Sequence, residues 1–220
     1  MTEQLNKQRL FYAFFIPSLG VFIMGFVFVL TQFFNSNLET WGVWPRHWQG
    51  FVGIVTHIFV HSSWQHLLNN LLSFWILSVT LFYFYHNIAL KIILYQWILV
   101  GFCIWLGARD GHHVGASGLI YALAFFLFVS GFIRRHIPLI AISFIVAFLY
   151  GSMVWHIFPW QPNETVSWEG HLFGAIIGVI LAFIYRYQGP QKPVKVWAEE
   201  LPDEEDPFWD IPLEDDEKLS

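Results

Sequence analysis

Long apolar segments alternate with short polar segments along this chain, and their lengths predict membrane-spanning helices. The first uncharged run, Phe11 to Phe34, is long enough to cross a hydrocarbon core of about 30 Å. Backbone groups in lipid must be hydrogen-bonded within their own segment, so runs that lack the alternation of strands are expected to be helical. The pattern predicts six spans, at residues 11–34, 61–85, 88–106, 117–132, 137–158 and 170–187.

The composition supports an all-α integral membrane protein. Of its 220 residues, 56% are hydrophobic and only 12% are charged, whereas a soluble domain carries about a quarter charged residues. Residues 191–220 hold eleven of the sixteen acidic side chains, so the net charge of −5 describes the C-terminal end alone. We divide the chain into an N-terminal tail (1–10), a membrane domain (11–188) and an acidic tail (189–220) expected to be disordered.

Basic residues in the short loops predict the orientation, because cytoplasmic loops are enriched in lysine and arginine. With the N-terminus inside, only Arg46 and Arg109 lie outside the cell. Eight basic residues then lie on the cytoplasmic side: Lys7, Arg9, Lys91, Arg134, Arg135, Arg186, Lys192 and Lys195. We expect both termini in the cytoplasm and the lipid bilayer as the main partner, with no nucleic-acid partner.

Polar residues within spans are costly and often mark function. The fourth span opens with Gly115-Ala116-Ser117-Gly118. The glycines permit close backbone approach, and the helix N-terminus favours negative charge near the serine. A serine N-cap with glycines for helix packing explains the same four residues.

The sixth span carries a histidine beside a stripe of glycines. Gly170, Gly174 and Gly178 recur every fourth residue, so they form one smooth face against which a neighbouring helix can pack closely. His171 follows the first of these glycines. A histidine near a helix end is commonly structural, but this one lies beside a groove suited to close approach.

A third polar group precedes and opens the second span. His66 and Asn70 are four residues apart, hence on one helix face, and both side chains can donate hydrogen bonds. His57 and His61 share this spacing and could ligate a metal together with His112-His113, although no His-Glu-x-x-His motif is present. We expect neither a metal nor another cofactor.

The acidic residues exclude other chemistry. Outside the tail they are Glu3, Glu39, Asp110, Glu164 and Glu169, all assigned to ends or loops. A two-aspartate intramembrane protease is therefore excluded, and proton transport through buried carboxylates is disfavoured. Cys103, the single cysteine, has no base partner in the sequence. Serine with histidine remains the best pair for covalent chemistry.

Taken together, these motifs resemble the rhomboid family of intramembrane serine proteases. The likeness lies in three motifs, placed in order on the second, fourth and sixth spans: His57-x3-His61-x4-His66-x3-Asn70, Gly115-Ala116-Ser117-Gly118 with Tyr121, and Gly170-His171-x2-Gly174-x3-Gly178. It implies a six-helix rhomboid-like bundle. One departure is Val52-Gly53, where many family members carry a Trp-Arg pair.

The resemblance implies roles for these residues. Ser117 would attack the scissile carbonyl, and His171 would act as general base. His66, Asn70 and the backbone N–H of Ser117 would hold the oxyanion, and Tyr121 would pack against the His171 ring. Gly115, Gly118 and Gly174 would support the site.

The implied substrates are single-span membrane proteins cleaved near the outer leaflet, in a bacterial inner membrane. Two alternatives stay open. One is an inactive rhomboid-like protein that binds membrane clients, and the other is a small transporter with a polar cavity.

Overall fold

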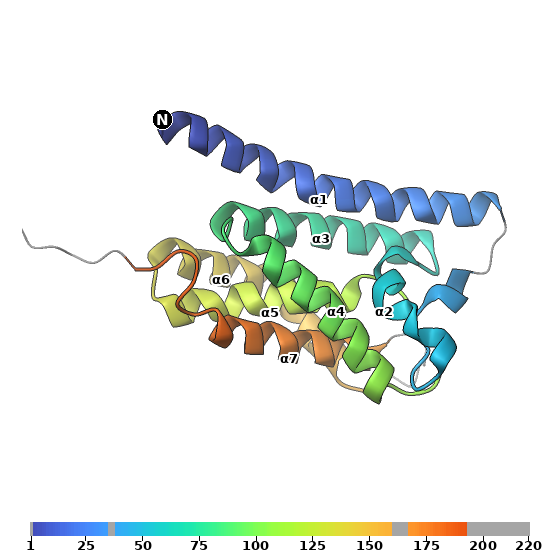
Figure 1. The fold of residues 1–220 in the computed structure, drawn as a ribbon. Coiled ribbons are helices and arrows are strands. Elements are labelled where there is room, and N and C mark those ends of the chain that lie inside the picture. Colours follow the sequence, from blue (N-terminus) through green and yellow to red (C-terminus); the bar gives the residue numbers. More distant parts are fainter. Residues whose placement is uncertain (1, 35–37, 160–166, 193–220) are drawn as a thin grey trace, which may run out of the picture.

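The computed structural model describes residues 2–34, 38–159 and 167–192, and within them it contains helices and no β-strand (Figure 1). This confirms the expected all-α fold. The acidic tail was expected from residue 189, and its residues after 192 lie outside the described part of the chain. The elements are α1 (Thr2–Phe33), η1 (Leu38–Trp41), η2 (Trp48–Phe51), α2 (Gly53–Thr56), η3 (His57–Phe59), α3 (Trp64–Phe84), α4 (Ala89–Gly107), α5 (Ser117–Arg134), α6 (Ile137–Tyr150), η4 (Gly151–Ile157) and α7 (Trp168–Ile184).

Five helical segments are long and apolar enough to cross a membrane, and α7 is a shorter apolar helix of 17 residues. Several boundaries differ from the sequence-based expectation. Helix α3 begins at Trp64 rather than His61, because Ser63 caps the helix. Helix α1 begins at Thr2 rather than Phe11, because the polar residues before the apolar run continue the helix. The fifth span changes after Tyr150 from α-helix to the 3₁₀ segment η4. Helix α7 begins at Trp168 rather than Gly170.

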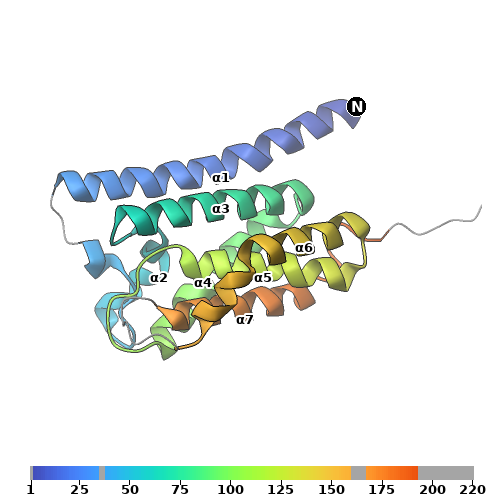
Figure 2. The ribbon, with the colours of Figure 1, turned by 180° about the vertical axis from the view of Figure 1, so that it is seen from behind.

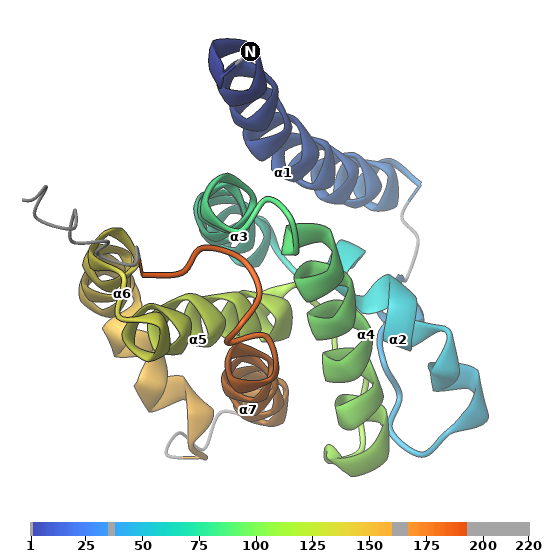
Figure 3. The ribbon, with the colours of Figure 1, turned by 60° about the vertical axis from the view of Figure 1, so that its left-hand side comes forward.

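Helix α5 is the central element of the bundle. It contacts α3, α4, α6 and α7, which surround it in the view along the bundle (Figure 3). About 67% of the residues in the apolar stretch of α5 are buried inside the protein, against 22% for α1 and 17% for α6 with η4. Helix α1 lies at the periphery and packs along α3, as the two opposite views show (Figures 1 and 2). A residue on α5 is therefore held from several sides.

The predicted glycine face of the last span packs directly on α5. A Cβ atom added at Gly174 would lie 2.1 Å from the carbonyl oxygen of Gly118, and one added at Gly178 would lie 2.4 Å from that of Ala122. These separations are far below van der Waals contact, so only glycine fits. The two backbones consequently approach closely along the half of the bundle that begins with Ser117.

The close approach at Gly174 predicts a loss of stability in the Gly174→Ala variant. The added methyl meets backbone rather than a flexible side chain, so the helices must separate, at a cost of about 1–3 kcal/mol. Thermal unfolding in detergent should show a lower Tm. Gly25→Ala in α1 is the matched control, because a Cβ there has no neighbour within 4 Å. An equal Tm for both variants would contradict this packing argument.

Charged residues mark the two ends of the bundle. At one end Arg134 is buried at the end of α5, where it donates to the carbonyls of Tyr185 (2.7 Å) and Gln188, and Arg9 of α1 donates to the carbonyl of Tyr83 at 2.6 Å. At the other end Arg109 follows α4 and forms an ion pair. The N-termini of α5 and α7, with Ser117 and His171, lie at this second end.

The loop after α1 is tied to the segment that precedes Ser117. Val43 and His113 exchange two backbone hydrogen bonds of 2.9 and 2.8 Å, and the N–H of Gly115 donates to the carbonyl of His57 at 2.9 Å. Gly53, the departure from the family pattern, packs so closely that a Cβ would lie 2.2 Å from the carbonyl oxygen of Gly42. A larger residue would not fit there without a shift of the backbone around Gly42.

Candidate active site

The structure brings Ser117 and His171 into direct contact at the start of two neighbouring helices. Ser117 is the first residue of α5, and His171 lies in the first turn of α7. The Ser117 Oγ and the His171 Nε2 are 3.0 Å apart, within hydrogen-bonding distance. His171 is buried and Ser117 is half-buried. This contact depends on the glycine-mediated approach of α5 and α7.

Tyr121 lies one helical turn after Ser117 and stacks on the imidazole of His171. The ring centroids are 4.2 Å apart and the ring planes differ by 8°. The Tyr121 hydroxyl donates to the carbonyl of Met153 in η4 at 2.9 Å. Tyr121 therefore holds the face of the histidine ring and also joins α5 to η4.

Side-chain donors from α3 lie against the backbone just before Ser117. Gly115 has a φ of +105°, a conformation that favours glycine. A Cβ added there would lie 2.6 Å from the His66 Nε2 and 3.3 Å from the Asn70 Nδ2. The Asn70 side chain is buried, and its Nδ2 has no hydrogen-bond partner among the described residues. Asn69 is exposed instead, so α3 presents Asn70 to the site.

A polar network that the sequence did not indicate anchors the start of α7. The hydroxyl of Ser167 accepts from the backbone N–H of Gly170 and lies 2.6 Å from the His113 Nδ1. The His113 Nε2 bonds to the carbonyl of Arg109 at 3.0 Å. A carbonyl only accepts, so Nε2 carries the proton and Nδ1 accepts from Ser167. This second Ser–His pair caps the helix that carries His171.

Glu169 completes the anchor, and it lies at a helix end, as expected from the sequence. It lies within the first turn of α7, where its side chain is buried and its Oε1 is 3.6 Å from the Arg109 Nε. The backbone N–H of Arg109 also donates to this oxygen, at 3.3 Å. The sequence suggested no partner for Glu169, because Arg109 is sixty positions earlier. This pairing offsets part of the cost of burying the carboxylate, whose Oε2 has no hydrogen-bond partner among the described residues.

The remaining histidines of the His57-x3-His61-x4-His66 motif, His57 and His61, are buried. The Nδ1 of His57 donates to the carbonyl of Gly53 at 2.9 Å, and the rings of His61 and His66 meet edge-to-face at 5.0 Å. Within the described residues, no three His, Cys, Asp or Glu side chains are arranged to hold a metal ion. The metal alternative, built on His57, His61, His112 and His113, therefore has no cluster to support it in this part of the chain.

Burial of His57 predicts acid destabilisation. Burial lowers the pKa of His57 from 6.5 to about 4, because the charged imidazolium is desolvated in the loop before α3. The unfolded chain then binds a proton that the folded chain does not, so stability falls as the pH drops from about 6.5 to about 4. The loss is on the order of 3 kcal/mol for this group.

Thermal unfolding in detergent between pH 7.5 and 4.5 measures this effect. His57→Gln should flatten the fall in Tm over that range, whereas His112→Gln, at an exposed position, should leave it unchanged. An identical pH dependence in the parent and His57→Gln would show that another group controls acid stability.

The fold and the site define an all-helical integral membrane protein with a hydrogen-bonded Ser–His pair at one end of its bundle. The sequence pattern of the Rhomboid domain matches residues 46–188. Uncharacterized proteins of Mycobacterium bovis and Mycobacterium tuberculosis are 32% identical over 173 residues, covering 74% of this chain and 71% of each relative. An uncharacterized protein of Mycobacterium leprae is 33% identical over 133 residues, which is 57% of this chain and 52% of that relative. The chain belongs to the rhomboid family.

Proposed function

We propose that this protein is an intramembrane serine endopeptidase in which Ser117 is the nucleophile and His171 the general base. The observation that carries the proposal is the 3.0 Å contact between the Ser117 Oγ and the His171 Nε2. A nucleophile activated by an adjacent, oriented base is the arrangement that covalent catalysis requires. Stacking on Tyr121 supplies orientation to the base.

In the proposed reaction, the Ser117 Oγ forms a bond to the scissile carbonyl carbon while its proton passes to the His171 Nε2. The tetrahedral intermediate collapses, the peptide C–N bond breaks, and His171 gives the proton to the departing amine. A water molecule then attacks the acyl-enzyme, with His171 again as base, and releases Ser117 and the new carboxylate. Each proton transfer uses the same nitrogen, which already faces the serine.

The negative charge of the intermediate requires donors aimed at the carbonyl oxygen. We propose His66, Asn70 and the backbone N–H of Ser117 for this role. The first N–H groups of a helix have no intrahelical partner, so the start of α5 offers free donors. The Asn70 Nδ2, which lies beside Gly115 and has no hydrogen-bond partner in the described part of the chain, supports this assignment. Gly115 gives these side chains room, while Gly118 and Gly174 hold α5 against α7.

The proposed substrates are single-span membrane proteins, because the site lies at one end of a bundle whose outer surface is apolar. The cations Arg134 and Arg9 lie at the opposite end. By the charge rule that end faces the cytoplasm, which places Ser117 toward the outer leaflet and both termini inside. We propose the bacterial inner membrane as the location, in keeping with the mycobacterial relatives.

Cleavage of a single-span test substrate by purified protein tests the function, with Ser117→Ala as the paired variant. The parent should cleave, and Ser117→Ala should not, while both unfold at the same temperature. Cleavage that survives Ser117→Ala would exclude this nucleophile.

Labelling with a fluorophosphonate separates a protease from an inactive client-binding relative without requiring the correct substrate. The probe should attach to the parent and not to Ser117→Ala. An unlabelled parent would favour the inactive rhomboid-like protein. The transporter alternative predicts solute flux that tolerates Ser117→Ala.

A further inference from the structure

The second ring nitrogen of His171 faces a backbone carbonyl of another element. The His171 Nδ1 lies 3.0 Å from the carbonyl oxygen of His156, in the last turn of η4. The carbonyl can only accept, so Nδ1 must carry the ring proton. In the neutral imidazole the Nε2 is then unprotonated and free to accept from Ser117. One contact thus fixes the tautomer that a general base needs.

The sequence after η4 explains why this carbonyl is available. In a 3₁₀ helix the carbonyl of residue 156 would accept from the N–H of residue 159. Residue 159 is proline, which has no N–H. Phe158 before it adopts the extended conformation expected ahead of proline, with φ −108° and ψ 149°. Pro159 therefore ends η4 and leaves the His156 oxygen without that partner.

A carboxylate orients the histidine of serine protease triads. Among the described residues, the carboxylate nearest to His171 in the sequence is engaged elsewhere. Glu169, two residues before His171, is paired with Arg109 at 3.6 Å and accepts its backbone N–H. The side chain of His156 is exposed, and the group that contacts the His171 Nδ1 is its backbone carbonyl. The position that an aspartate would occupy is taken by a peptide carbonyl.

We propose that the backbone carbonyl of His156 is the positioning group of His171, so that η4 supplies the third member of the catalytic unit. This inference rests on the proposed function. During catalysis the imidazolium formed at Nε2 keeps its Nδ1–H on the carbonyl, whose dipole stabilises the positive charge. Catalytic competence consequently depends on where η4 sits against α5 and α7.

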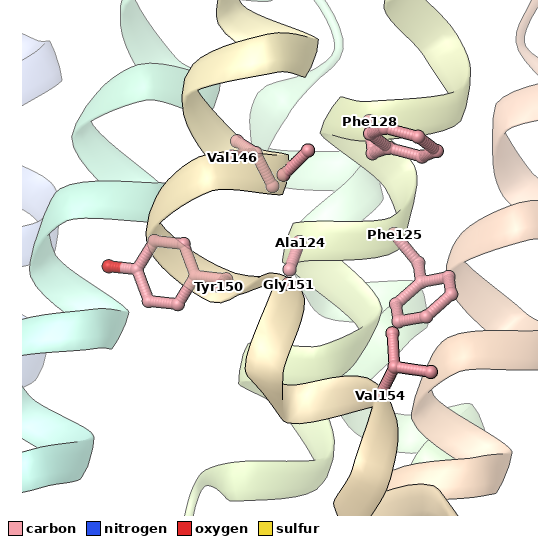
Figure 4. A pocket seen from close by; sticks show the side chains of 8 residues that line it. Ala124, Phe125, Phe128, Val146, Tyr150, Gly151 and Val154 are labelled. Carbon is pink, nitrogen blue, oxygen red and sulfur yellow. The ribbon is translucent and has the colours of Figure 1, made fainter.

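Few contacts hold η4 in place. Ile157 packs with Tyr121 and Ala175 in a small apolar cluster, and the Tyr121 hydroxyl binds the Met153 carbonyl. The start of the segment borders an apolar cavity of about 120 Å³ between α5 and α6 (Figure 4). Gly151 and Val154 of η4 line this cavity together with Phe125 of α5. The cavity removes packing on that side, so the Tyr121–Met153 bond contributes more to the position of η4.

Nitrogen-15 NMR of protein labelled in its histidine rings tests the inference directly. The His171 signals are assigned by their loss in His171→Asn. At neutral pH the parent should show a protonated Nδ1 and an unprotonated Nε2. The opposite tautomer would overturn the proposal, whatever the activity.

A backbone ester tests the carbonyl itself. Replacing Ile157 by its α-hydroxy analogue converts the amide carbonyl of His156 into an ester carbonyl. The oxygen of an ester carbonyl is a weaker hydrogen-bond acceptor. We expect kcat to fall by about 3–10-fold, the value of one ordinary hydrogen bond, with KM unchanged and the Nδ1–H tautomer no longer dominant. The same replacement at Trp155 also alters one η4 peptide but not this carbonyl, and should leave both readouts as in the parent.

Tyr121→Phe provides a second variant if the ester does not fold. It keeps the ring that stacks on His171 and removes the bond to Met153, so the tautomer should become mixed. If a folded variant, either the Ile157 ester or Tyr121→Phe, keeps both the His171 tautomer and the kcat of the parent, the inference is overturned. The proposed function is tested separately, by cleavage in the parent and its loss in Ser117→Ala. Failure of the His156 inference can therefore be told apart from failure of the protease proposal.

Discussion

We expect His171→Ala to lower kcat for peptide cleavage by about 10⁴-fold or more, because a general base alone contributes about 10²–10⁴-fold and the members of a serine catalytic unit act together. Without the imidazole, the Ser117 hydroxyl keeps its proton and the departing amine receives none. The residual rate would come from substrate binding and the oxyanion donors. KM should change little, since the ring acts on the serine rather than on the ground-state substrate.

The measurement is single-turnover cleavage of a single-span substrate in detergent or vesicles. His86→Ala is the matched control: this exposed histidine lies in the turn between α3 and α4, at the far end of the bundle from Ser117, and its loss should leave kcat unchanged. Equal unfolding temperatures for His171→Ala and the parent separate chemistry from folding. A loss of less than about tenfold would sit below the contribution of any positioned base and would contradict the assigned role.

Asn70→Ala should reduce kcat by about 10²–10³-fold, the loss that follows removal of one oxyanion donor. The Asn70 Nδ2 is buried beside Gly115 without a partner among the described residues. Such an orphaned donor is costly unless a ligand satisfies it. A developing oxyanion would do so only in the transition state, so the effect should appear in kcat and leave KM nearly unchanged.

Asn69→Ala is the natural control, because Asn69 is the exposed neighbour on the other face of α3. It should retain the parent rate. Removing the buried Asn70 amide also relieves an unsatisfied group, so its variant should unfold at the same or a higher temperature. A rise in KM with kcat unchanged would assign Asn70 to substrate recognition instead. Equal losses in both variants would indicate a general disturbance of α3.

The long helices and the family could be predicted from the sequence because both depend on local patterns. Uncharged runs in lipid must form helices, so the position of each span follows from the chain itself. The glycine stripe from Gly170 to Gly178 likewise predicts a close approach, although not the helix that makes it. The structure identifies that partner as α5, through the contacts of Gly174 with Gly118 and of Gly178 with Ala122.

The break between α6 and η4 could not be predicted from hydrophobicity. Residues 137–158 form one uncharged and mostly apolar run, whose hydrophobicity does not show where the α-helix gives way to the 3₁₀ segment. Pro159 indicates where the segment ends, but not which of its residues face α5 and α7. That orientation is set by tertiary contacts, with Ile157 packed on Ala175 and the Tyr121 hydroxyl bonded to the Met153 carbonyl.

The network at the start of α7 was missed for a different reason. His113 and Ser167 are 54 residues apart, and Arg109 and Glu169 are 60 apart. Nothing in the local sequence relates them. Only the folding of the α4–α5 loop onto the N-terminus of α7 brings their side chains together, and this loop is fixed by the hydrogen bonds between His113 and Val43.

The sequence by itself determined the order of the long apolar helices, the uneven distribution of basic residues and the serine and histidine motifs that suggest covalent chemistry, because each depends on residue type and spacing along one chain. The tertiary structure decided which of these groups meet. It placed Ser117 against His171 and aimed the carbonyl of His156 at the second ring nitrogen. These are distances between separate helices, set by how closely glycine allows their backbones to pack.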